Sequence, residues 1–170
     1  MPLYLLYPKD FFKPLSTLEY LTLIGMKKKI ITGLIGIVVI MQLLRPTRNV
    51  SDQISENEIS KHYQIPEELH AILKKSCYDC HSNNTQYPWY VNIQPIGWWL
   101  QSHVNDGKRH LNFSEFGSYP EKKAKHKFEE MEDAMTNGWM PLESYLLIHQ
   151  EAKLTPEQYK SLAQWAGALK

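Results

Sequence analysis

The two cysteines of this chain stand two residues apart, at Cys77 and Cys80, and His81 follows directly. A Cys-x-x-Cys pair followed by His is the spacing of covalent c-type haem attachment. The two thiols can add to the two vinyl groups on one edge of a haem, and His81 can place an imidazole nitrogen under the iron. A haem tethered in this way needs no large pocket for retention. The motif therefore predicts a small domain folded around one covalently attached haem.

Charge and aromatic content support a cofactor-binding domain and exclude a nucleic-acid binder. From Ser51 onward the chain holds 12 Lys and Arg against 16 Asp and Glu, a net charge of 12 − 16 = −4. A nucleic-acid binder would carry a concentrated basic face instead. All five tryptophans follow Ser82. Three of them, Trp89, Trp98 and Trp99, lie in a segment broken by prolines, which we expect to cover one face of the porphyrin.

A basic and then apolar segment precedes the domain. Lys27 to Lys29 are followed by a mainly apolar run from Ile30 to Leu44, the order found in export signals. No small-residue cleavage site follows the run, so residues 26–45 predict an uncleaved signal anchor, with a cleaved signal peptide as the alternative. The lysines favour an inside N-terminus, although Arg45 weakens that bias. Haem c is attached outside the cytoplasm, so we expect the domain on the periplasmic side of a bacterial inner membrane.

The other boundaries follow from composition. Residues 1–25 hold apolar patches without a clear period, and we interpret them as the product of a mis-assigned upstream start, with a short interfacial helix as the alternative. Residues 46–60 are polar and predict a linker. The haem c-binding domain then spans residues 61–170.

Four segments of the domain carry helical patterns. Pro66 and two glutamates open a helix that runs into Cys77. A second is expected from Ile96 to about Asp106, with Gly107 as its C-cap. A third spans 120–137 and ends at Asn137-Gly138. The last opens with a capping box at Thr155. With long aromatic loops between them, these helices predict an all-α, cytochrome-c-like domain.

Two other chemistries fit a Cys-x-x-Cys pair less well. A redox dithiol belongs in a strand–helix–strand context, whereas the flanking segments here are helix and loop. A zinc site needs four ligands, and adjacent Cys80 and His81 fit one tetrahedron poorly.

A sixth ligand for the iron is expected from Met140. It stands between a helix end and Pro141, off the apolar stripe that carries Met131 and Met135. His/Met ligation suits an electron carrier because it raises the reduction potential. The alternative sixth ligand is His103, followed by His149 and His110. His62, His70 and His126 have polar neighbours and are expected on the surface. An open sixth position is the remaining possibility.

Several stretches together resemble a known family. They are residues 77–90 (CYDCHSNNTQYPWY), 95–100 (PIGWWL), 103–104 (HV), 107–108 (GK), 111–114 (LNFS) and 140–142 (MPL). They are similar to the haem-binding domain family of Bacteroidetes, small exported proteins with one C-x-x-C-H-S motif. The resemblance covers about Arg45 to Leu169 and implies covalent haem c in a cytochrome-c-like helical domain. The Met140-Pro141 pair and the final helix are also similar to the ends of ordinary cytochromes c.

The expected function is one-electron transfer with redox partner proteins, without enzymatic activity of its own. A haem-based sensor or peroxidase-like protein is the rival, and it needs an open sixth position on the iron. An accessory subunit of a respiratory complex is a second rival.

Overall fold

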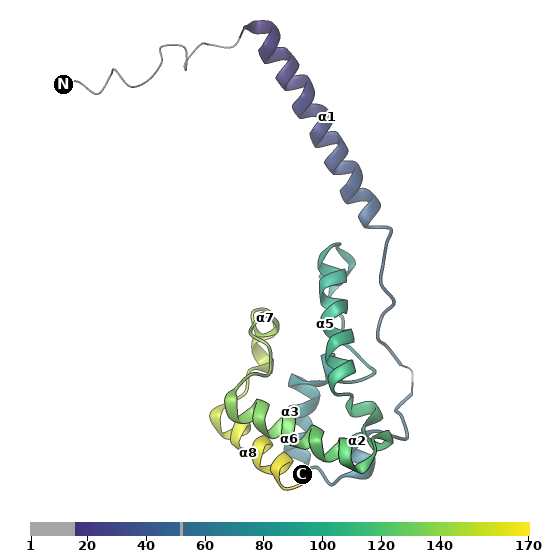
Figure 1. Cartoon of the computed structure of the whole chain (residues 1–170), viewed down its shortest axis with the longest axis vertical. Helices are drawn as coiled ribbons and strands as arrows, with labels where there is room; N and C mark the ends of the chain where they lie inside the picture. Colours follow the sequence, from purple (N-terminus) through teal and green to yellow (C-terminus); the bar gives the residue numbers. More distant parts are fainter. Residues whose placement is uncertain (1–15, 52) are drawn as a thin grey trace, which may run out of the picture. The chain divides into compact units, whose positions relative to one another are not determined.

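A computed structural model describes residues 16–51 and 53–170, and all regular structure in these two ranges is helical (Figure 1). The chain divides into two units, Met1–Leu44 and Arg45–Lys170. The expectation of an all-α protein is confirmed for the described residues.

The first unit consists of helix α1, Thr17–Met41. Ser16 caps it, because its side chain accepts a hydrogen bond from the backbone N–H of Glu19 while the Glu19 carboxylate accepts one from the Ser16 backbone (2.9 Å). The helix runs without interruption through Met26, so residues 17–25 are not a separate short helix. None of the described helices is long and apolar enough to cross a membrane. The part of the start hypothesis that concerns residues 1–15 lies outside the described residues.

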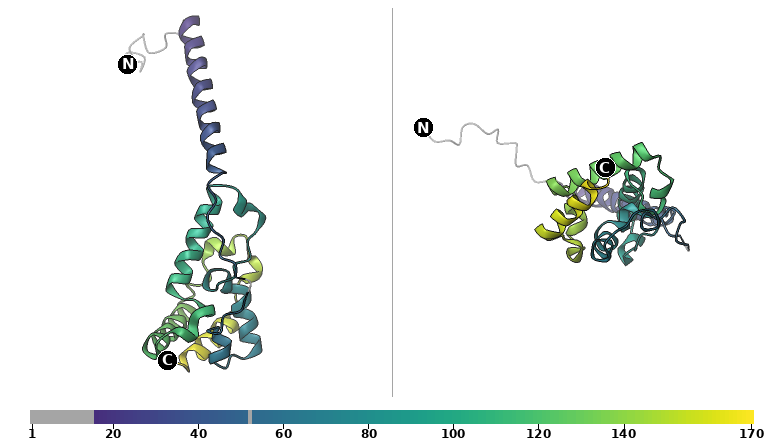
Figure 2. Two further views of the ribbon diagram at one scale, coloured as in Figure 1. Left: turned by 90° about the vertical axis from the view of Figure 1, so that its right-hand side faces the viewer. Right: turned by 90° about the horizontal axis from the view of Figure 1, so that it is seen from below.

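Within its described residues, the second unit contains four longer helices and three single turns of α-helix. The longer ones are α3 (Glu67–Ser76), α5 (Ile96–His110), α6 (Glu121–Asn137) and α8 (Pro156–Gly167). The single turns are α2 (Ile59–His62), α4 (Tyr78–His81) and α7 (Glu143–Leu146), and the 3-10 turns are η3 (Trp89–Asn92), η4 (Phe113–Ser118) and η5 (Gln150–Ala152). Helices α6 and α8 pack against each other, as both views in Figure 2 show.

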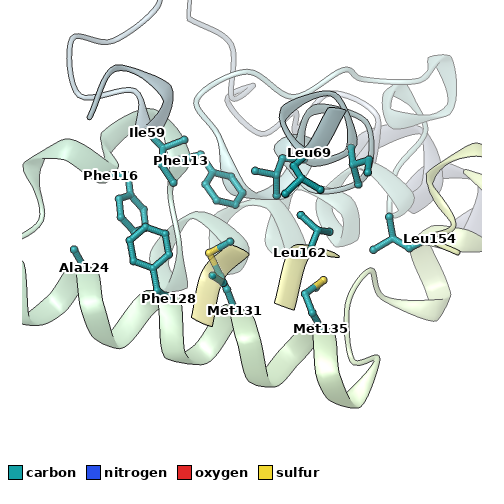
Figure 3. Close-up of a cluster of buried hydrophobic side chains, with 13 residues drawn as sticks. Ile59, Leu69, Phe113, Phe116, Ala124, Phe128, Met131, Met135, Leu154 and Leu162 are labelled. Carbon is teal, nitrogen blue, oxygen red and sulfur yellow. The ribbon is translucent and has the colours of Figure 1, made fainter. Parts of the chain in front are cut away.

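The apolar stripe of α6 forms one wall of the core. Ala124, Phe128, Met131 and Met135 are buried, and Figure 3 shows them pointing from α6 toward Phe113, Phe116 and Leu162. Phe113 and Phe116 both lie in η4 and are buried. Gly138 ends α6 with φ of 67°, a conformation that favours glycine.

Local signals predicted several helix ends correctly. Thr155 caps α8 through the expected capping box, with its hydroxyl accepting from the backbone N–H of Gln158 (3.2 Å). Helix α3 begins after Pro66 and ends directly before Cys77. Helix α5 corrects the prediction, because it continues past Gly107 to His110 and Gly107 therefore lies inside the helix rather than at its C-cap.

The polar segment predicted as a linker is held against the domain. The Asn49 side chain donates to the Ser82 carbonyl and to Thr85 Oγ1, both at 2.9 Å. The Thr85 backbone N–H donates to the Asn49 carbonyl at 3.0 Å. Further along, Ile59 is fully buried in the core. The segment thus braces the loop that follows His81.

Candidate functional site

The Cys-x-x-Cys-His motif forms one tight turn at the end of α3. Cys77 ends α3 and also precedes α4, and its carbonyl accepts from the backbone N–H groups of Cys80 (3.2 Å) and His81 (3.0 Å). Neither cysteine is in a disulfide. Because the turn brings residues three and four positions apart to one side, both thiols and the imidazole line the same cavity.

This cavity has a volume of about 320 Å³ and a predominantly apolar wall. Two further cavities, of about 150 and 190 Å³, share residues with it. The combined lining includes Cys77, Cys80, His81, His103, His110, Met140, Leu142 and Tyr145. A mostly apolar hollow of this size with a few convergent polar groups is the usual form of a cofactor site.

His81 is oriented by two backbone carbonyls at the end of α5. Its Nδ1 lies 3.0 Å from the Gly107 oxygen and 3.0 Å from the Leu111 oxygen. Because carbonyls only accept hydrogen bonds, Nδ1 carries the proton and Nε2 keeps its lone pair. Burial also lowers the pKa of His81, so the ring is neutral. A neutral imidazole fixed through Nδ1–H is the form that binds a metal through Nε2.

Close packing at Gly107 holds α5 against the motif. A Cβ placed on Gly107 would lie 2.7 Å from the Cys80 oxygen and 2.9 Å from the Cys80 Cβ. Only glycine allows this approach, and the approach brings the Gly107 carbonyl to His81. Gly107, which the sequence predicted to be a helix C-cap, is therefore a site of close packing instead.

The thiols have the wrong acidity for disulfide exchange. Burial, reinforced by the neighbouring Cys80, raises the pKa of Cys77 to about 12, and burial next to Asp79 raises that of Cys80 to about 11. Redox-active thiols in such motifs have lowered pKa values instead. In the described ranges, no three His, Cys, Asp or Glu side chains gather to form a metal site, so the zinc alternative finds no ligand set there. The residues present fit a haem better than either alternative.

The structure places three of the proposed sixth ligands around the cavity. Met140 lines both the first and the second cavity, together with Cys77 and His81. His110 lines the same two, and His103 lines the first and third. The Nδ1 of His103 lies 2.9 Å from the Trp99 carbonyl, so its Nε2 is the nitrogen left for other contacts.

The remaining histidines lie elsewhere. His149 lines the third cavity but not the first, and His62, His70 and His126 line none of the three. The last of these makes ion-pair contacts with two glutamates on the exposed side of α6.

The three tryptophans expected to cover a haem differ in their position relative to the cavities. Trp99 lines the third cavity and is 52% exposed. Trp89 is 76% exposed and contacts Tyr90 edge to face, with ring centroids 6.0 Å apart. Neither Trp89 nor Trp98 lines any of the three cavities. The structure therefore brings Trp99 to the site and leaves the other two outside it.

Sequence reasoning missed two tyrosine–carboxylate pairs beside the motif. The Tyr145 hydroxyl donates to Asp79 (2.8 Å), and the Tyr78 hydroxyl donates to the buried Glu58 (2.6 Å). Burial is the main cause that raises the pKa of both tyrosines. Tyr78 and Asp79 occupy the two positions between the cysteines of the motif, and this position was the signal that could have pointed to them. Their partners, Glu58 and Tyr145, are 20 and 66 residues away in the sequence.

The model of the haem-binding domain family matches residues 36–168, which is most of the chain. No curated protein and no solved structure matches it. The match includes the motif, the helix that orients His81 and the segment that carries Met140. On these grounds the chain is a haem-binding protein and belongs to the haem-binding domain family.

Proposed function

We propose that the protein is a monohaem cytochrome c, with one haem bound covalently through Cys77 and Cys80. The observation that carries the proposal is the joint placement of both thiols and a neutral, oriented His81 on one apolar cavity. Both thiols line this apolar cavity, which supports thioether attachment over free thiols.

His81 and Met140 are the residues that would hold the iron of the haem. Both line the first and the second cavity. A bound haem would supply one-electron chemistry through its iron, and a methionine ligand together with a histidine ligand would raise its reduction potential. His103 is the alternative sixth ligand, since its free Nε2 belongs to a side chain of the same cavity.

Electron transfer is the favoured role over sensing or peroxidase-like chemistry. A sensor or a peroxidase needs an open sixth position, whereas here three side chains able to bind iron line the cavity wall beside His81. The predominantly apolar wall would also influence the reduction potential, because burial of the iron is another means of setting it. A cytochrome-c-like arrangement, with α3 delivering the motif and α8 closing the core, is part of this proposal.

The domain is proposed to face the periplasm, held at the inner membrane by the segment around α1. Support comes from the apolar run after Lys29, whose side chains from Ile30 to Ile40 are more than half exposed at most positions. Apolar side chains around a helix normally require a lipid or protein environment.

Acid–acetone extraction tests covalent attachment. Haem should stay with the wild-type polypeptide and should be extracted fully from the Cys77→Ala, Cys80→Ala double variant. Complete extraction from the wild type would refute covalent attachment and leave haem binding itself intact.

The absorption spectrum of the oxidised protein tests the sixth ligand. Methionine–iron ligation gives a weak band at the red end of the spectrum, which should vanish in Met140→Leu. The matched control is Met135→Leu, a change of similar volume at a buried methionine that lines the second cavity. A band that survives in Met140→Leu would contradict the assignment, and loss of the native spectrum in His103→Ala would favour histidine.

A further inference from the structure

Exposed apolar side chains gather at one edge of the domain. Trp89, Ile93, Ile96, Trp99 and Ile148 are between 42% and 76% exposed. We call these five residues the aromatic edge. Ile96, Trp99 and Ile148 line the same cavity of about 190 Å³, so α5 and the segment after α7 contribute to one surface. Scattered exposed apolar residues are ordinary, but a contiguous patch of this kind marks a contact surface.

Four of the five residues of the aromatic edge, all except Ile148, lie in one stretch of sequence without charged residues. No Asp, Glu, Lys or Arg occurs between Asp79 and Asp106, a run of 26 residues that contains two of the exposed tryptophans. Elsewhere charge is dense, as on α6, where ion pairs join Lys125 to Glu121 and Lys127 to Glu130. The Asp79 carboxylate lines the cavity that Ile96, Trp99 and Ile148 share, so charge is sparse but present at this edge. A surface rich in Trp, Tyr and Ile with few charges suits the boundary between lipid tails and water, where tryptophan and tyrosine are enriched.

The chain enters the domain beside this edge. The Arg48 guanidinium donates to the Asn92 side chain at the end of η3 (2.7 Å) and lies 5.4 Å from the centre of the Tyr87 ring. Only four residue steps separate Leu44, the end of the first unit, from Arg48. Four extended residues span at most about 14 Å. If the apolar run is held in a bilayer, η3 is therefore confined close to the lipid surface.

We propose that the aromatic edge rests in the headgroup region of the same bilayer that holds the segment around α1. The proposal rests on the membrane anchoring given above. Trp89 acts as an interface anchor, and Arg48 adds a positive charge at the phosphate level. The domain then keeps one orientation on the membrane instead of turning freely on its tether.

Single cysteines introduced into the full, haem-loaded chain in phosphatidylcholine vesicles test the proposal, with the alkylation rate by a sulfonated maleimide as readout. Trp89 is 76% exposed and Trp139, on the loop after α6, is 62% exposed. If the domain does not touch lipid, these exposed fractions predict that Trp89→Cys reacts at least as fast as Trp139→Cys. A domain resting on lipid predicts the reverse order, with Trp89→Cys several-fold slower than both Trp139→Cys and the α8 control Lys160→Cys.

A cysteine inside α1 separates the two ideas. If Ile37→Cys is inert and Trp89→Cys reacts as fast as Trp139→Cys, the chain is anchored and the aromatic edge does not touch lipid. If Ile37→Cys reacts as fast as Lys160→Cys, the anchor itself is refuted, and the edge proposal falls with it. Protection of Trp89→Cys in native membranes but not in protein-free vesicles would overturn the lipid proposal in favour of a protein partner.

Discussion

Replacement of Gly107 by alanine tests whether close packing of α5 on the motif holds the site together. The added Cβ would meet the Cys80 carbonyl oxygen at 2.7 Å and the Cys80 Cβ at 2.9 Å. Both distances are shorter than normal contacts, and the first involves backbone that cannot rotate away. Helix α5 must then move outward from α4.

The net effect on stability is a balance of two terms. Overpacking of a tight contact costs about 1–3 kcal/mol, whereas alanine is favoured over glycine inside a helix by about 1 kcal/mol. Since the Cys80 backbone cannot move aside, we expect the overpacking cost to exceed the gain in helix propensity, with a net loss of up to about 2 kcal/mol in the free energy of unfolding.

Denaturant unfolding of the haem-loaded protein, followed by far-ultraviolet circular dichroism, measures this loss. Ser102→Ala is the control, because Ser102 is exposed on the same helix and the change adds helix propensity without a clash, worth about 0.5 kcal/mol of stabilisation. If Gly107→Ala raises stability as Ser102→Ala should, α5 does not need the close approach. The explanation of how His81 Nδ1 reaches the Gly107 carbonyl would then be wrong.

Three further outcomes are expected. Tyr145→Phe removes the hydrogen bond to Asp79 (2.8 Å) and should lower the free energy of unfolding by about 1 kcal/mol in denaturant titrations; an unchanged midpoint would contradict the role of that pair. Folding raises the pKa of Tyr78 and Tyr145. Their contribution to stability is therefore intact below the usual tyrosine pKa of about 10 and is lost as the pH rises toward the folded-state pKa values. The free energy of unfolding should fall above pH ~10, and it should fall less steeply in Tyr145→Phe. Thr155→Ala removes the N-cap of α8 and should cost about 1 kcal/mol, seen as a lower thermal midpoint; equal midpoints would mean that tertiary packing alone sets the start of α8.

Much of the site was predictable because the residues that carry its chemistry are close together in the sequence. Cys77, Cys80 and His81 are four positions apart at most, so one turn of chain brings them together whatever the rest of the fold does. The same holds for the cap at Thr155 and for the apolar stripe of α6, both of which depend on residues three or four positions apart. All-α architecture followed from such local patterns.

The tertiary structure alone decided the contacts between distant segments. The carbonyls that orient His81 belong to residues 26 and 30 positions later in the sequence. One of them belongs to Gly107, which lies inside α5, although local sequence patterns predicted that this helix ends there. Local sequence also could not place Trp89 outside the cavities while bringing Trp99 to one of them, because both are tryptophans among prolines and aromatics. Periodicity and caps act over one helical turn, whereas burial and hydrogen bonding of a side chain depend on which distant segment packs against it. The sequence thus determined the haem motif and the helices by itself, and the packing of α5 on that motif decided how His81 is held.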